Sequence, residues 1–142
     1  MTNINPGLWG KHAWAFMYYV AFGYPDTPSD KDKNAIKSFF FNLQNILPCD
    51  KCKNNFQANL QKYPLNDSIL NNRDDLVKWV VTINNEVNKE TNRPLTSYEE
   101  VTHKYLTFPN NECIIENNIW SVVIVSVFIV ACLIIFLKCY SK

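Results

Sequence analysis

Apolar side chains that recur at spacings of three and four residues restrict this chain to an α-helical fold. The clearest stretch lies between positions 36 and 47, where the apolar residues are Ile36, Phe39, Phe40, Leu43, Ile46 and Leu47. A helix with 3.6 residues per turn places these side chains on one stripe, whereas a strand needs strict alternation. The chain has only 3 glycines and no alternating segment. We therefore predict an all-α fold.

Prolines and polar capping residues predict where the helices begin and end. The prolines at positions 25 and 48 separate a first helix over 9–24, a second over 28–47 and a third that continues to position 60. A fourth helix follows position 72, and a short fifth helix begins at position 96 or 97. The expected N-terminal caps are Thr27 before Pro28, Asn72 with Asp75 three residues on, and Thr96 or Ser97.

A run of 19 residues without a charge, at 119–137, stands apart from this pattern. As a helix it would extend about 28 Å, close to the hydrocarbon thickness of a bilayer, about 30 Å. Trp120 and Tyr140 near its ends suit the two interfaces. A small domain cannot surround a helix that is apolar on every face. The expected organisation is a domain at 1–107, a linker at 108–118, a transmembrane helix at 119–137 and a tail at 138–142.

The expected membrane topology follows from the two ends of the chain. The first residues lack the basic and apolar regions of a signal peptide, which predicts that the domain stays on the cytosolic side. Lys138 and Lys142, after the apolar run, favour the opposite orientation. We expect a single-pass protein with a C-terminal anchor. The net charge of +1, without a basic block, predicts no nucleic-acid partner.

Cys49 and Cys52 stand three positions apart at the predicted start of the third helix, directly after Pro48. This spacing allows the two sulfurs to form a bond or to release it. Unpaired N–H groups at a helix N-terminus favour a thiolate, and Lys51 and Lys53 add positive charge. Thiolate character favours thiol–disulfide exchange at neutral pH.

Several functions are compatible with this cysteine pair. A thioredoxin-like domain requires strands, for which the sequence has no pattern. A zinc site needs two further ligands, and His103 and Cys113 are available, although without paired spacing. Two inert core cysteines are a further alternative. A redox disulfide on a helical bundle needs an electron acceptor.

Two further segments could hold a planar acceptor. Trp9 and Trp14 open the first helix, while Asn85 and Asn88 lie three positions apart near the end of the fourth. The two asparagines could hydrogen-bond to a heterocycle or a ribose, and Trp14 and Trp79 could stack on rings. Core packing of the tryptophans and a solvated helix end are the structural alternatives.

Taken in order, these segments resemble the Erv/ALR family of FAD-dependent sulfhydryl oxidases. The family pattern is Trp-Gly-x-x-x-Trp, Tyr-Pro, Cys-x-x-Cys and His-Asn-x-Val-Asn. The matching residues here are Trp9-Gly10 with Trp14, Tyr24-Pro25, Cys49 with Cys52, and Asn84-Asn85-Glu86-Val87-Asn88. The resemblance covers about residues 8–106 and is closest in form to the oxidases of large cytoplasmic DNA viruses. It implies a four-helix bundle with a short fifth helix, FAD at the mouth of the bundle, and a homodimer.

The resemblance also implies roles for individual residues. Cys52 would lie against the flavin and pass electrons to it, while Cys49 would exchange with the incoming thiol. Molecular oxygen would then take the electrons and become hydrogen peroxide. The expected FAD-binding residues are Trp9, Gly10, Lys11, Trp14, Tyr18, Trp79, Asn84, Asn85, Val87, Asn88, Lys89 and Tyr105. No metal is expected.

Two positions depart from the family pattern. Asn84 replaces the first histidine of His-Asn-x-Val-Asn, and Tyr18 stands where many members carry histidine. Because asparagine can hydrogen-bond and tyrosine can stack, we expect FAD to be retained with altered affinity. For a viral protein, the resemblance would place the anchor in a virion membrane or on the cytoplasmic side of a host membrane.

The other cysteines decide which partner is expected. Cys113 alone cannot form the shuttle pair that many relatives carry, so we expect Cys49 to exchange directly with a thiol-containing protein substrate or a thioredoxin-like carrier. Cys132 is expected to pack within the membrane, and Cys139 to be acylated or free. The competing function is a zinc-stabilised or structural membrane adaptor without oxidase activity.

Overall fold

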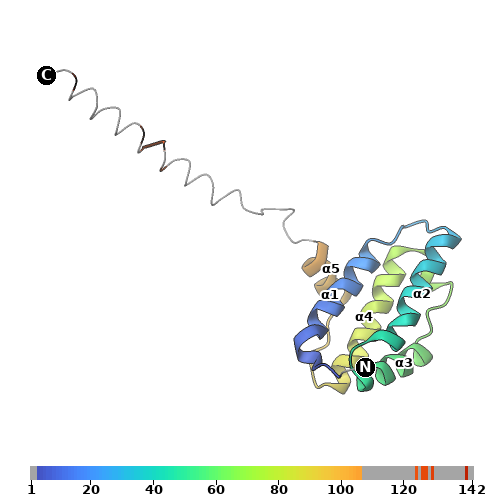
Figure 1. Ribbon diagram of the computed structural model, residues 1–142. Helices are drawn as coiled ribbons and strands as arrows, with labels where there is room; N and C mark the ends of the chain where they lie inside the picture. The colour runs from blue at the N-terminus through green and yellow to red at the C-terminus, as the bar shows by residue number, and fades with distance from the viewer. Residues whose placement is uncertain (1–2, 107–123, 125, 128, 130–139, 141–142) are drawn as a thin grey trace. The chain divides into compact units, whose positions relative to one another are not determined.

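A computed structural model of the chain describes residues 3–106 together with positions 124, 126, 127, 129 and 140. The chain divides into two units, Met1–Phe108 and Pro109–Lys142 (Figure 1). The elements of the first unit are α1 (Pro6–Phe22), α2 (Asp30–Ile46), α3 (Asp50–Lys62), the 3₁₀-helix η1 (Ile69–Asn71), α4 (Arg73–Glu90) and α5 (Tyr98–Leu106). The described residues contain no strand. The predicted all-α fold, with four main helices and a short fifth, is confirmed in this unit.

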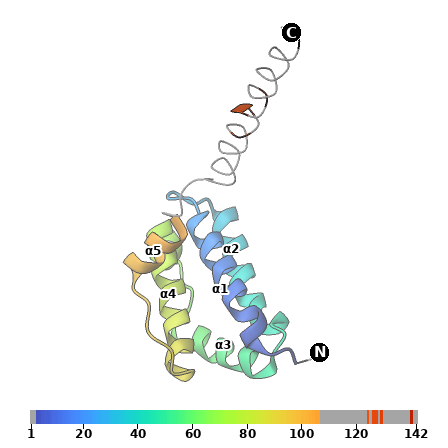
Figure 2. The same ribbon diagram turned by 90° about the vertical axis from the view of Figure 1, so that its left-hand side faces the viewer.

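Helix α4 is the centre of the bundle. It packs against α1, α3, α5 and η1, and its residues Leu76, Val77, Val80 and Ile83 are fully buried. Helix α2 packs on α3, and α5 lies beside α1 and α4 (Figures 1 and 2). Both views place the N-terminal end of α1 close to α3. The segment that carries Trp9 and Gly10 therefore lies at the same end of the bundle as the cysteine pair.

The start of α2 differs from the prediction. Ser29, rather than Thr27, is the N-cap, and its backbone N–H donates to the carboxylate of Asp32 at 2.9 Å. The N–H of Asp32 donates in return to Oγ of Ser29 at 3.3 Å. This capping box satisfies two backbone donors at once, whereas a cap at Thr27 with Pro28 would leave Asp32 without its reciprocal bond.

The starts of α1 and α4 show how local capping sets a helix boundary. Helix α1 begins at Pro6, three residues before the predicted Trp9, because Asn5 caps it and proline suits the first helical position. Helix α4 begins as predicted after Asn72, whose Oδ1 accepts a hydrogen bond from the N–H of Asp75 at 2.8 Å.

The prediction of a transmembrane helix at 119–137 is wrong. No helix in the part of the chain that the structure describes is long and apolar enough to cross a membrane. A span needs about 20 mainly apolar residues. The longest described helix, α4, has 18 residues and carries charges of both signs. Most of 119–137, the linker predicted at 108–118, and Cys113, Cys132 and Cys139 lie outside the described residues.

Candidate active site

A disulfide joins Cys49 to Cys52 at the start of α3. The two Cα atoms are 5.1 Å apart, inside the ordinary range for disulfides. Cys49 is the N-cap of α3, and its Sγ accepts a hydrogen bond from the backbone N–H of Cys52 at 3.2 Å. The sulfur of Cys49 thus lies at the helix end where unpaired N–H groups and the helix dipole favour negative charge.

A cavity of about 200 Å³ lies against this disulfide. Residues of α1, α3, the end of α4 and the chain after α4 form its walls. Six of the residues predicted from the sequence line it together: Trp9, Gly10, Trp14, Cys49, Cys52 and Val87. The walls are mainly apolar, and the two tryptophans face the same space as the disulfide. A redox pair and two large aromatic side chains therefore share one cavity.

Trp79, a further predicted binding residue, lies in the core instead. It is 5% exposed and packs edge-on against Phe40, with the ring centroids 4.9 Å apart. Its indole Nε1–H donates to the carbonyl of Tyr63 at 2.9 Å. These contacts correspond to the core packing that the sequence left as an alternative for this tryptophan.

The two positions that depart from the family pattern contact each other. The side-chain amide of Asn84 donates to the hydroxyl of Tyr18 at 2.9 Å, and the ring of Tyr18 stacks on Tyr105 at a centroid distance of 4.9 Å. Burial raises the pKa of Tyr18 to about 12, with the hydrogen bond from Asn84 acting in the opposite direction. These three predicted binding residues form a cluster between α1, α4 and α5, and none of them lines the cavity.

The remaining predicted residues also lie away from the cavity wall. The side-chain amide of Asn85 makes two hydrogen bonds to the backbone of Thr96, in the segment before α5. Its nitrogen donates to the Thr96 carbonyl at 2.8 Å, and its oxygen accepts from the Thr96 N–H at 2.9 Å. Asn88 donates weakly to Asn85 at 3.5 Å. Lys11 is exposed on α1, and Lys89 is ion-paired within α4.

Glu86 on α4 makes two ion pairs, of which the one with Lys62 links α4 to α3 and the one with Lys89 stays within α4. Its carboxylate lies 2.6 Å from Nζ of Lys62 and 2.6 Å from Nζ of Lys89. The hydrogen bonds from Lys62 and then from Lys89 lower the pKa of Glu86 to about 2. This link fixes the C-terminal part of α3 against α4, and so helps to position the helix that carries the cysteines.

The cavity also contains residues that the sequence analysis missed. Asn55 and Phe56 follow Cys52 by three and four residues, a helical spacing that could have revealed them. Lys51 and Arg93 are exposed at the wall, and within the described chain no hydrogen bond or ion pair holds their side-chain nitrogens. Nothing in the local pattern signals Arg93, because its place depends on the turn after α4.

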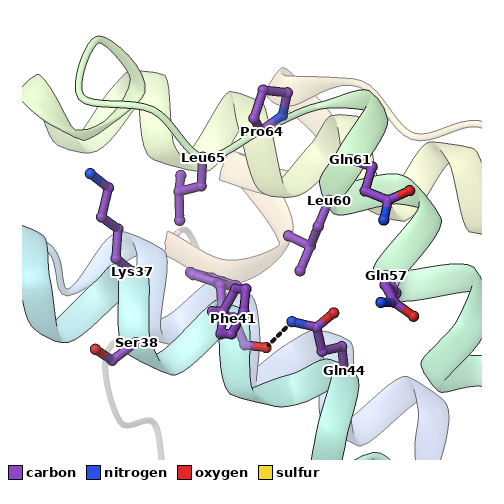
Figure 3. A pocket seen from close by; sticks show the side chains of 10 residues that line it. Lys37, Ser38, Phe41, Gln44, Gln57, Leu60, Gln61, Pro64 and Leu65 are labelled. Atoms are coloured by element: carbon purple, nitrogen blue, oxygen red, sulfur yellow. Dashed lines mark hydrogen bonds between the residues drawn. The ribbon is translucent and has the colours of Figure 1, made fainter.

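A larger hollow of about 540 Å³ lies between α2 and α3 (Figure 3). Its charged residue Lys37 is ion-paired with Asp67 at 2.7 Å, and Gln44 donates to the carbonyl of Phe41 at 3.0 Å. It contains no cysteine. We therefore take the smaller cavity beside the disulfide as the candidate active site.

The zinc alternative lacks a cluster of ligands in the described residues. These residues contain no group of three or more histidine, cysteine, aspartate or glutamate side chains that could hold a metal ion. The sulfurs of Cys49 and Cys52 are bonded to each other and are not available as thiolates. Of the two further ligands considered, His103 lies on α5 and Cys113 lies outside the described residues.

Comparisons with known proteins agree with this geometry. Residues 11–106 match the model of the Erv1/Alr family. A probable FAD-linked sulfhydryl oxidase of Acanthamoeba polyphaga mimivirus is 41% identical over 97 residues, which are 68% of each chain. An FAD-linked sulfhydryl oxidase of African swine fever virus is 32% identical over 68% of this chain and 79% of its own.

Solved structures show the same fold. The crystal structure of the yeast Erv1 core has a TM-score of 0.65 at 24% identity, covering 74% of this chain and 86% of that chain. The FAD binding domain of Erv1 from Saccharomyces cerevisiae has a TM-score of 0.66 at 24% identity, covering 72% and 94%. With the family match over most of the first unit, these findings show that the chain belongs to the Erv1/Alr family.

Proposed function

We propose that this protein is an FAD-linked sulfhydryl oxidase, which forms disulfide bonds in protein thiols and reduces oxygen to hydrogen peroxide. The observation that carries the proposal is the Cys49–Cys52 disulfide in the wall of a cavity that also contains Trp9 and Trp14. Membership of the Erv1/Alr family and the names of the viral relatives support it. When bound, FAD supplies the two-electron acceptor that the cysteine pair lacks, and it delivers the electrons to oxygen.

The cavity fits one part of FAD rather than the whole cofactor. Its volume of about 200 Å³ is below the roughly 300 to 1,000 Å³ of most small-molecule pockets. The apolar walls and the rings of Trp9 and Trp14 suit a planar heterocycle. The exposed cations Lys51 and Arg93, whose side chains have no partner among the described residues, are suited to meet the phosphates. Lys89, which is also among the expected FAD-binding residues, is ion-paired with Glu86.

We assign different roles to the two cysteines. A substrate thiolate attacks Sγ of Cys49, so the Cys49–Cys52 bond breaks, a mixed disulfide forms and Cys52 leaves as a thiolate. A second substrate thiolate then attacks the substrate sulfur, and Cys49 leaves. The substrate has lost two electrons and gained a disulfide, while the enzyme pair has gained both electrons. The position of Cys49 as the N-cap of α3 supports this assignment. The N–H of Cys52 donates to Sγ of Cys49, and so it stabilises the Cys49 thiolate that leaves in the second step.

The test uses the purified full chain. We expect a yellow protein that consumes oxygen in the presence of dithiothreitol, and we expect Cys52→Ser to lower turnover by at least about a thousandfold because the electron path is broken. The matched control is Cys113→Ser, which should keep the parent rate if Cys49 exchanges directly with the substrate. A colourless chain without oxygen consumption would refute the oxidase, and unchanged turnover in Cys52→Ser would refute the electron path.

We further propose that two copies of the chain associate. The support is a set of aromatic side chains exposed on α1 and α2, with Phe16 59%, Tyr19 53% and Phe41 61% accessible, together with the homodimer that the family resemblance implies. Large exposed aromatics are favoured at interfaces between proteins. Sedimentation equilibrium of the parent and of Phe16→Ser would test this, with a monomeric parent contradicting it.

A further inference from the structure

The N-terminal strap, residues 3–5, runs beside the loop that carries Cys49. The N–H of Ile4 donates to the carbonyl of Pro48 at 2.8 Å. The side-chain oxygen of Asn3 accepts from the N–H of Asp50 at 2.8 Å, and its amide nitrogen donates to the Asp50 carboxylate at 3.0 Å. The strap therefore holds the residue before Cys49 and the residue after it.

The strap is itself anchored to the wall of the cavity. The indole Nε1–H of Trp9 donates to the carbonyl of Ile4 at 3.2 Å, and the side chain of Asn5 accepts from the N–H of Gly7 at 2.8 Å to cap α1. A chain of hydrogen bonds thus runs from α1 through the strap to the cysteine loop. The loop is positioned by contacts that are distant in sequence.

The backbone at Cys49 depends on hydrogen bonds from the strap more than the backbone at an ordinary N-cap residue does. Serine, threonine, aspartate and asparagine are the usual N-caps, and cysteine is not among them. Pro48 has no N–H to bind the loop from the other side. In the oxidised chain, the bond to Cys52 also holds the sulfur in place, but this bond opens in every catalytic cycle.

We propose that Asn3 is a positioning residue for thiol exchange: together with Ile4 it fixes the backbone on both sides of Cys49, so that Sγ of Cys49 stays at the N-terminus of α3 after the disulfide opens. This inference rests on the proposed function only in taking Cys49 as the exchanging thiol. Held there, the Cys49 thiolate keeps the hydrogen bond from the N–H of residue 52, which makes it a better attacking and leaving group.

Asn3 also contacts Asp50, the negatively charged residue that follows Cys49. The hydrogen bond from Asn3 and then the one from Lys53 hold the pKa of the Asp50 carboxyl below its usual range, and Asp50 is ionised at neutral pH with or without Asn3. The other charged groups near Cys49 are Lys51 and Lys53 on α3 and Arg93 after α4. Substitution of Asn3 leaves all of these charges in the chain. A change in the reactivity of Cys49 would therefore report on how firmly the strap fixes the backbone around Cys49.

The experiment measures the reactivity of Cys49 itself. In the full chain carrying Cys52→Ser, iodoacetamide is added at a series of pH values, and mass spectrometry of the Cys49 peptide gives its alkylation rate apart from the other cysteines. With Asn3→Ala added, we expect alkylation at pH 7 to be about threefold slower and the midpoint of the pH profile to rise by about half a unit.

Asn54→Ala is the matched control, because it removes the same kind of side chain from an exposed position of α3, two residues after Cys52, and takes no hydrogen bond of the described chain away from the strap or the cysteine loop. It should leave the Cys49 profile unchanged. An Asn3→Ala profile equal to that of the parent would overturn the proposal, as would an equal shift in Asn54→Ala. The alkylation measurement needs neither flavin nor turnover. A failure of the proposed oxidase activity, which is tested by oxygen consumption, would therefore be distinguished from a failure of the role proposed for Asn3.

Discussion

The cavity beside the disulfide and the polar cluster between α1, α4 and α5 were expected to serve the same cofactor, yet they are built differently. At the cavity, apolar walls surround the Cys49–Cys52 pair, and the cations Lys51 and Arg93 have no side-chain partner within the described chain. In the cluster, Asn84 and Tyr18 satisfy each other. The difference is that the polar side chains of the cluster are already hydrogen-bonded to each other, whereas the cations at the cavity have hydrogen-bonding capacity to spare within the described chain.

The first prediction compares one tryptophan from each region. Trp79→Ala removes a buried ring that packs on Phe40, so the free energy of unfolding should fall by about 3–5 kcal/mol. Trp9→Ala removes a half-buried ring from the cavity wall, and should lower flavin content with a smaller loss of stability. Denaturant unfolding and flavin absorbance measure the two effects. Equal losses of stability in both variants would break the comparison.

The second prediction concerns the polar cluster. Asn84→Ala leaves the buried hydroxyl of Tyr18 without its donor, which should cost about 1–3 kcal/mol of stability. Tyr18→Phe in the same background removes the unsatisfied group and should recover part of that loss. A double-mutant cycle by denaturant unfolding gives the coupling energy. Additive losses would show that the two side chains do not support each other.

The third prediction uses pH to test the link between α3 and α4. The pKa of Glu86 is lowered from 4.5 to about 2 in the folded chain, so its contribution to stability is complete above about 4.5 and is lost as the pH falls towards 2. Glu86→Gln should lose stability at neutral pH and show a weaker acid dependence over that range. Thermal melts from pH 6 to pH 2 would measure both slopes, and parallel curves would contradict the assignment.

The smallest effect is expected in the larger hollow. Gln57→Ala changes an exposed residue of its wall, so stability should stay within about 0.5 kcal/mol and flavin content should not change. Asn55→Ala, two positions earlier and on the wall of the cavity, also removes the hydrogen bond that Asn55 donates to Glu90 on α4, so the wall should loosen and flavin content should fall. A loss of flavin in Gln57→Ala would move the candidate site to the hollow.

The fold was more predictable than the site because its signals are local. The start of the fourth helix after position 72 and its Asn72 cap each depend on neighbours within a few residues, and both are confirmed. The cap of α2 was assigned to Thr27 because Pro28 suits the first helical position, whereas the structure begins the helix with the capping box of Ser29 and Asp32. The transmembrane prediction rested on the length and hydrophobicity of one segment and on the aromatic residues at its ends, not on contacts with other parts of the chain.

The site depended on contacts between distant segments, which a single sequence does not show. Asn85 has the chemistry of a ligand-binding residue, but its amide ties down Thr96, eleven residues later. Asn3 stands far from the cysteines in sequence, yet it bonds to Asp50. What the sequence showed correctly was the grouping of Trp9, Trp14 and the cysteine pair, because these motifs occur in a fixed order.

The close spacing of Cys49 and Cys52 has a consequence for how long the enzyme can work. The bond joins residues only three positions apart, so it restrains the unfolded chain by about 2 kcal/mol, against about 4.7 kcal/mol for a loop of 100 residues. The core around α4 is made of side chains that do not take part in the redox cycle. Opening this bond at each turnover therefore removes only that restraint of about 2 kcal/mol and leaves the contacts of the packed core in place.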